Sequence, residues 1–257
     1  MENENLPEVK VELKADLTEV ANKAYEDGGK KFVKELGKAG ATVVGLFNNT
    51  IGGAIEIYNT WARTKIENVK QNIQNNMLKI PPEKLITPPI NIIGPAMEGL
   101  KYNLDENELK QMFENLISNS CNSDYSNIVH PRFAEIIKQL SKDDALLLKE
   151  LSYKPCSAYP VANVINKTTS GFTTLFPNFY VSNSLDIKKV PAILNNLQTL
   201  GILEISYENF LTNDTLYDPI TNSMFYQELA INNPQISYQK GLFALTIFGR
   251  NFINVCI

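Results

Sequence analysis

Apolar residues recur at three- and four-residue steps over 104–153, which is the clearest helical pattern in the chain. Residues at that spacing share one face of a helix, so the pattern predicts three short amphipathic helices. The first helix should end at 119–127, because Asn, Ser and Asp side chains compete there for backbone hydrogen bonds. Pro131 suits the first position of the second helix, where its missing N–H would have no partner. We therefore expect a central three-helix bundle over 104–153.

The third helix has a start signal of its own. Ser141 is followed three residues later by Asp144, which resembles a capping box with Asp in place of Glu or Gln. The apolar residues that follow recur with a helical period and should face inward: Leu147, Leu148 and Leu151.

The N-terminal region, 1–79, also has a helical period. Small residues recur there at every fourth position from Gly37 to Gly53, and such a strip lets another helix approach closely. A stripe of larger apolar residues runs through the same segment. The predicted interaction face combines both sets: Gly37, Ala41, Gly45, Phe47, Ile51, Gly53 and Ile55.

The segment 39–55 contains no charged residue. Its length is at the lower limit for crossing a bilayer, and its asparagines and glycines make it a poor spanning helix. Two interpretations stay open. It is either a helix-packing surface of a folded protein, or a segment that meets a membrane in a triggered state.

Five prolines lie among apolar residues in the connector, 80–103. Repeated proline predicts a path without a regular helix, and the isoleucines predict that this path packs along a surface. We place the first domain boundary here.

The last region, 154–257, changes character. The segments 161–165 and 168–185 predict short strands and loops. Pro191 should open a helix that Gly201 ends. Two further strands and a closing helix are expected at 202–205, 242–247 and 249–256.

This order of helix, strand pair and helix is typical of a winged-helix module. The polar stretch 208–240 would then enlarge the wing. The predicted fold class is therefore mainly α, with an N-terminal helical region and a central helical bundle followed by a C-terminal winged-helix-like α+β module over 154–257.

A winged helix raises the question of DNA binding. The candidate nucleic-acid contacts lie around the predicted recognition helix, where Asn can read adenine edges: Lys188, Lys189, Asn195 and Asn196. Residues 171–257 nevertheless carry four basic and six acidic side chains, whereas a DNA-contacting domain presents a basic face. Nucleic acid is therefore not expected as the main partner.

Residues that carry chemistry are few. His130 is the only histidine, and its place before Pro131 at a helix start favours local hydrogen bonding over catalysis. The three cysteines are scattered and lack metal-ligand spacing. Asp143 and Asp144 lie together in a first helical turn, where they offset the helix dipole. We predict no catalytic, metal-binding or cofactor-binding residue, no cofactor and no small-molecule substrate, and thus no enzyme.

Charge and cysteine usage point to a compartment. The net charge is −4, and the N-terminus lacks the basic and apolar regions of a signal peptide. Unpaired cysteines are typical of buried thiols in a reducing cytosol. The expected location is the cytoplasm, with the membrane as a second location on activation.

Three runs of sequence carry a resemblance to a known family: ELKQMFENLISNSCN, HPRFAEIIKQLSKDDALLL and LTIFGRNFINVC. They resemble the abortive infection alpha family, a bacterial family linked to phage defence. The resemblance extends from around Thr42 to the C-terminus, and it implies a defence role without supplying catalytic residues.

The leading hypothesis is a non-enzymatic defence protein that acts through protein–protein contacts or self-association. Its partner would be another protein or a second copy of the chain. The alternatives are a membrane-perturbing effector that uses 39–55, and a winged-helix regulator that binds nucleic acid.

Overall fold

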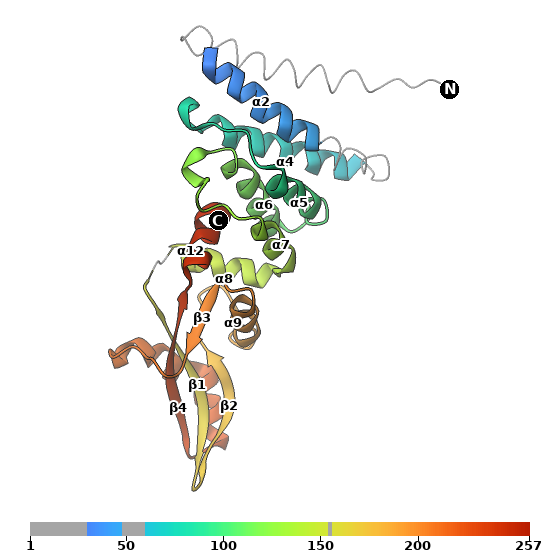
Figure 1. The fold of residues 1–257 in the computed structure, drawn as a ribbon. Coiled ribbons are helices and arrows are strands. Elements are labelled where there is room, and N and C mark those ends of the chain that lie inside the picture. The colour runs from blue at the N-terminus through green and yellow to red at the C-terminus, as the bar shows by residue number, and fades with distance from the viewer. Residues whose placement is uncertain (1–29, 48–59, 154–155) are drawn as a thin grey trace. The chain divides into compact units, whose positions relative to one another are not determined.

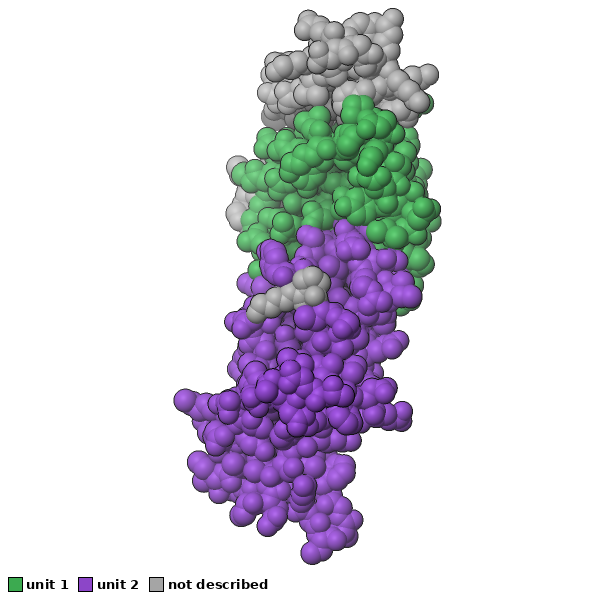
Figure 2. Space-filling model, turned by 90° about the vertical axis from the view of Figure 1, so that its left-hand side faces the viewer, with its two compact units in different colours: residues 1–135 green, residues 136–257 purple. Residues whose placement is uncertain are grey.

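A computed structural model describes residues 30–47, 60–153 and 156–257 (Figure 1). The chain divides into two compact units, which comprise residues 1–135 and 136–257 (Figure 2).

Unit 1 is helical in its described residues. Helix α6 lies at its centre and packs against α4 and α5, with Phe113, Leu116 and Ile117 fully buried. Helix α2 contacts α5. The elements in chain order are α2 (Lys30–Phe47), α4 (Thr60–Leu78), η2 (Pro82–Lys84), α5 (Ile90–Leu100), α6 (Asn107–Asn119) and η3 (Ser123–Tyr125), and α7 (Arg132–Gln139) crosses the boundary to unit 2.

The connector, 80–103, contains a regular helix, α5, where its prolines predicted none. Helix α5 includes Pro95, so the expectation of a path without regular helix is wrong. The helix begins directly after Pro89 and buries a face that includes Ile92, Ile93 and Met97. Tertiary packing of an apolar face supplies most of a short helix's stability and here outweighs the hydrogen bond that Pro95 removes. The expectation that the connector packs along a surface is confirmed.

The three helices predicted within 104–153 are present as α6, α7 and α8 (Lys142–Tyr153). The capping box is confirmed: the Ser141 N–H donates to Asp144 Oδ2 at 2.7 Å, and the Asp144 N–H donates to Ser141 Oγ at 3.2 Å. His130 has the local role expected of it, since its Nδ1 accepts from the Arg132 N–H at 3.1 Å. Whether 104–153 forms a domain of its own stays a prediction.

A four-stranded antiparallel sheet forms the centre of unit 2. Its strands are β1 (Tyr159–Thr168), β2 (Gly171–Phe179), β3 (Leu203–Ser206) and β4 (Ile236–Leu245), in the order β2-β1-β4-β3. The register pairs Val161 with Gly241 and Leu203 with Leu245. A tight hairpin joins β1 to β2, and its closing pair is Thr168 and Gly171.

This sheet overturns the predicted fold class. The chain is mixed α and β, so both the mainly α assignment and the winged-helix module are wrong. In the expected module the strands follow the recognition helix and form a small wing. Here β1 and β2 precede α9 (Val190–Thr199), and long β1 pairs with both β2 and β4.

The stretch expected to enlarge a wing is instead mostly helical. It contains η4 (Asp214–Tyr217), α10 (Asp218–Thr221) and α11 (Met224–Asn232), and its last residues begin β4. Its buried side chains pack on Ala162, Val164 and Phe179 of the sheet. Tyr217 is fully buried, and its hydroxyl donates to the Gly241 carbonyl at 2.7 Å. One face of the sheet is thus covered by these segments.

Helices α8, α9 and α12 (Ile247–Cys256) complete unit 2. The end of α9 follows the prediction, because Gly201 adopts a φ of 77°, which favours glycine. Helix α12 contacts α8 and β4 and approaches the chain before β3 very closely. A Cβ on Gly249 would lie 1.9 Å from the Ile202 carbonyl oxygen, so this crossing requires glycine.

Candidate functional site

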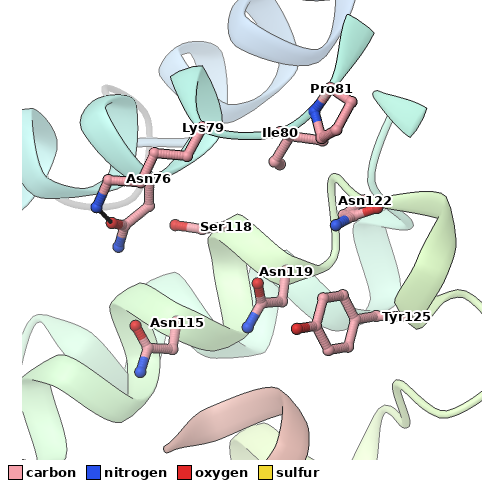
Figure 3. Close-up of a pocket in the computed structure, with 9 residues that line it drawn as sticks. All are labelled: Asn76, Lys79, Ile80, Pro81, Asn115, Ser118, Asn119, Asn122 and Tyr125. Carbon is pink, nitrogen blue, oxygen red and sulfur yellow. Dashed lines mark hydrogen bonds between the residues drawn. The ribbon is translucent and has the colours of Figure 1, made fainter. Parts of the chain in front are cut away.

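A polar cleft lies between the C-terminal part of α4 and helix α6 in unit 1 (Figure 3). Its cavity volume is about 260 Å³, and it is open to solvent along one side. Amides and hydroxyls dominate its lining: Asn76, Lys79, Ile80, Pro81, Asn115, Ser118, Asn119, Asn122 and Tyr125. We call it the asparagine cleft.

Helical spacing places these side chains along the cleft. Asn115, Ser118 and Asn119 are separated by three and four residues, so they share one face of α6. Asn76 lies in the last turn of α4, which packs against α6. Two helix faces thus bring polar side chains from distant parts of the chain together.

At one end of the cleft, hydrogen bonds and an ion pair join the segment after α4 to the segment after α6. Leu85 forms an isolated bridge with Asn122, and the Ile86 N–H donates to the Cys121 carbonyl at 2.8 Å. Lys84 pairs with Asp124 at 2.6 Å. These contacts hold the segment after α4 against the segment after α6, so the cleft is formed before any ligand arrives.

Intramolecular bonds determine how two of the amides are oriented. Lys79 Nζ donates to Asn76 Oδ1 at 3.1 Å, and the Asp124 N–H donates to Asn122 Oδ1 at 3.0 Å. An ammonium and a backbone N–H only donate, so each must face an amide oxygen. The Nδ2 groups of both asparagines therefore keep their hydrogens for other acceptors.

The two hydroxyls of the cleft differ. Ser118 Oγ donates to the Glu114 carbonyl at 2.7 Å, so its lone pairs alone face outward. The Tyr125 hydroxyl points into the cleft and makes no hydrogen bond with the rest of the described chain (Figure 3). It can both donate and accept.

Lys79 is the single charged side chain in the lining. Glu114 is near in sequence to these residues but is buried outside the lining, and both its oxygens accept from Asn72 Nδ2 at 3.2 Å. Burial raises the pKa of Glu114, and the Asn72 hydrogen bonds oppose that shift. The cleft thus offers an ammonium, amides and hydroxyls to a ligand.

Residues 62–256, 195 of the 257 in the chain, match the family model of abortive infection alpha. The chain belongs to the abortive infection alpha family. The resemblance of the three sequence runs is thereby confirmed, and it links the protein to abortive infection, a form of phage defence.

Two other comparisons add little to the family assignment. No curated protein matches the chain. Among solved structures, an uncharacterized protein from the hydrocarbon-degrading marine bacterium Alcanivorax borkumensis SK2 is similar, with 19% identity and a TM-score of 0.31. The match covers 52% of this chain and 94% of that chain. Similarity at this level carries no functional argument.

The predicted interaction face of this abortive infection alpha protein lies partly on α2. Gly37 and Ala41 are exposed and Gly45 is half-buried, whereas Ala39 and Val43 on the opposite side are buried. A Cβ at Gly37 or Gly45 would meet nothing within 4 Å among the described residues. The other predicted members lie outside what the structure describes: the Phe47 side chain, Ile51, Gly53 and Ile55.

The predicted nucleic-acid contacts are mostly engaged within unit 2. Lys189 pairs with Asp143 at 2.7 Å, while Lys188 is exposed. Asn196 Nδ2 donates to Asp144 Oδ2 at 3.0 Å, and Asn195 Oδ1 accepts from Asn178 Nδ2 at 2.8 Å. These bonds position α9 within the unit, while both lysines stay exposed and Lys188 Nζ lies 5.8 Å from the centre of the Phe225 ring.

The described part of the chain contains no helix with the length and apolar character needed to cross a membrane. The candidate membrane segment 39–55 extends beyond that part at residue 48. Within the described ranges no three His, Cys, Asp or Glu side chains are grouped to hold a metal ion.

The expectation of buried thiols is confirmed for two cysteines and wrong for the third. Cys121 and Cys256 are buried, and Cys156 is exposed. Burial raises the pKa of Cys121 to about 12.

Sequence reasoning missed the asparagine cleft. Asparagines at 119–127 were interpreted only as a signal that ends a helix. A usable signal was present, because asparagines recur four residues apart on both helices, at Asn72 and Asn76 and at Asn115 and Asn119. Paired polar rows on two predicted helices indicate facing surfaces once the helices are known to pack.

Proposed function

We propose that this abortive infection alpha protein is a non-catalytic defence protein that binds another polypeptide through the asparagine cleft. The amide-rich lining is the observation that supports the proposal. The Nδ2 groups of Asn76 and Asn122 can donate hydrogen bonds to carbonyl oxygens, and a polypeptide carries such oxygens in every peptide group. No lining side chain normally exchanges protons near neutral pH, which favours binding over acid–base chemistry.

The size and openness of the cleft favour a polypeptide over a small molecule. Small-molecule pockets usually enclose about 300–1,000 Å³ and bury most of the ligand. The asparagine cleft is smaller than that and open along one side. A polypeptide segment can place a few groups in the cleft and continue across the neighbouring surface.

The defence assay tests the proposal with a matched pair of variants. Asn76→Leu removes a lining amide while keeping a side chain of the same branching and number of heavy atoms. Asn75→Leu makes the same change one residue earlier on α4, at an exposed position outside the lining. We expect phage plating efficiency to rise with Asn76→Leu and to stay at the wild-type level with Asn75→Leu, at equal protein levels. Full protection against phage by Asn76→Leu would show that the defence function does not need the cleft.

A photo-crosslinking residue distinguishes a polypeptide partner from a small ligand. Pro81 lines the cleft and is exposed, so a benzoylphenylalanine there should form a protein adduct during infection. The same group at Asn75 serves as the control. Adducts of equal yield at both positions would show that the crosslink does not report on the cleft.

Self-association through α2 is a second candidate, and the exposure of Gly37 and Ala41 favours it. The added side chains of Gly37→Leu and Gly45→Leu begin in open space, and leucine favours helix more than glycine does. We therefore expect the fold to tolerate them and any α2-mediated oligomer to dissociate in analytical ultracentrifugation. Gln71→Leu, which adds the same group at an exposed position of α4, is the control. An unchanged sedimentation profile would exclude α2 as the contact.

A further inference from the structure

We infer that the asparagine cleft recognises a carboxylate of its partner polypeptide, supplied by an Asp or Glu side chain or by a chain terminus. The inference rests on the proposed function and adds the chemical class of the group that enters the cleft. It is based on which hydrogen-bond donors and acceptors of the lining side chains have no partner within the protein in the bonds described above.

Asn76, Asn122 and Lys79 each present donors to the cleft. The oxygens of Asn76 and Asn122 already accept from Lys79 Nζ and from the Asp124 N–H, so these amides present Nδ2 hydrogens. Lys79 has further ammonium hydrogens after its bond to Asn76, and the Tyr125 hydroxyl can donate. A group with two acceptor oxygens fits these donors better than a neutral amide, which has one.

The charge of the lining favours a ligand group with a single negative charge. The lining contains one cation and no carboxylate, so it attracts a negative group. A phosphate group carries about 1.5 to 2 negative charges near neutral pH, and proteins usually bind it with arginines or several cations. One ammonium with neutral donors matches the single charge and the two oxygens of a carboxylate.

The acidic residues around the cleft do not oppose this assignment. Asp124 is the acid closest in sequence to the lining Asn122, and its carboxylate is paired with Lys84 at 2.6 Å. Glu114 is buried and held by Asn72 outside the lining. Both carboxyl groups are thus engaged with other groups, and Lys79 is the charged side chain of the lining itself.

Carboxylate binding can be detected at the amides themselves. Acetate is added to the isotope-labelled full-length protein at constant ionic strength with chloride as the balancing anion, and side-chain amide signals are followed by NMR. We expect the Nδ2 signals of Asn76 and Asn122 to move with a common saturation curve while that of Asn75 stays. Stationary cleft signals at the highest tolerated acetate concentration would overturn the inference. So would movement with inorganic phosphate but not with acetate.

Short peptides then distinguish the two sources of the carboxylate. One neutral host sequence is used with a central Glu or Gln, each with a free or an amidated C-terminus. Binding that is about tenfold tighter with Glu assigns a side chain, and the same gain with the free acid assigns a terminus. Equal affinity of all four peptides would refute the carboxylate and leave peptide binding intact. If none binds although acetate does, the carboxylate stands and the proposed polypeptide partner fails.

Two variants test the contacts while keeping the fold. Asn122→Asp keeps an oxygen for the Asp124 N–H but replaces the Nδ2 donor with negative charge, so carboxylate binding should be lost. Lys79→Gln should weaken acetate binding about tenfold, whereas Lys110→Gln makes the same charge change outside the lining and should have little effect. Equal weakening by both lysine variants would indicate general charge attraction and would refute a built site.

Discussion

Replacing Gly249 with alanine should unfold unit 2 locally or entirely, because no space exists for the added methyl group. The Cβ would lie 1.9 Å from the Ile202 carbonyl oxygen and 2.8 Å from its carbonyl carbon. Ordinary contacts to a Cβ begin at 3.4 Å, so α12 and this backbone would have to separate by about 1.5 Å.

The backbone on both sides of this contact is held by hydrogen bonds. The Ile202 N–H donates to the Leu197 carbonyl at 2.9 Å, and its oxygen accepts from the Thr246 N–H at 3.0 Å. Thr246 Oγ1 also caps α12 by accepting from the Gly249 N–H at 2.8 Å. Separation would strain or break these bonds. Overpacking costs about 1–3 kcal/mol and each lost bond about 1 kcal/mol, so we expect at least about 3 kcal/mol.

Hydrogen exchange followed by mass spectrometry checks this prediction, because it resolves the two units separately. Peptides from α12 and β3 should lose protection in Gly249→Ala, while peptides from α5 and α6 keep theirs. Gly94→Ala on α5 is the matched control, since its Cβ would meet nothing within 4 Å among the described residues. It should stabilise unit 1 by about 0.5–1 kcal/mol. Wild-type protection of α12 in Gly249→Ala would refute the close crossing.

Three further predictions concern ionisable side chains. Burial raises the pKa of Glu114 above its usual 4.5, so the folded protein binds this proton more tightly than the unfolded chain and its stability falls as pH rises through the raised pKa. Glu114→Gln should therefore be more stable than the wild type at neutral pH and lose that advantage near pH 4.5. A stability difference that does not change with pH in urea titrations would contradict this. Glu150 is buried and accepts hydrogen bonds from Tyr180, Ser182 and Asn183. Glu150→Ala should therefore lower the free energy of unfolding by about 2 kcal/mol or more and speed amide hydrogen exchange over 180–183. Unchanged exchange over 180–183 would contradict the structural role of Glu150. Ellman's reagent should modify Cys156 alone in the native protein and three thiols after unfolding, and native modification of Cys121 would contradict its burial.

Local signals in the sequence were enough to predict the helices of 104–153 and the end of α9. Ser141 with Asp144 forms the expected cap, and Gly201 has the positive φ expected of a glycine that ends a helix. Such signals depend on neighbouring residues alone, so one sequence suffices to find them. The helix through Pro95 was missed because its stability comes from distant side chains.

Strands were predicted near all four observed positions, at 161–165, 168–185, 202–205 and 242–247. The single sheet that joins them was missed because its pairing is non-local and its turns lack strong signals. The hairpin between β1 and β2 turns at Thr169 and Ser170, without the Asn-Gly or Asp-Gly sequence that marks such turns. Pro177 and Asn178 interrupt the alternation of β2, and Asn178 adopts a φ of 47°. The first half of β4 is half-buried and mixed in polarity, so it resembled part of a polar insertion.

The donor character of the asparagine cleft is the property that no sequence pattern could supply. An asparagine offers an oxygen and an NH₂ group with equal ease, and its residue type does not say which of them faces a ligand. In this fold Lys79 and the Asp124 N–H each engage an amide oxygen, so Asn76 and Asn122 both present hydrogens. Neighbouring groups in the fold thereby make donors of two neutral side chains, and the proposed carboxylate site rests on these donors. Asn122→Asp is therefore the most informative variant, because it keeps an oxygen for the Asp124 N–H and replaces the Nδ2 donor that faces the cleft with a negative charge.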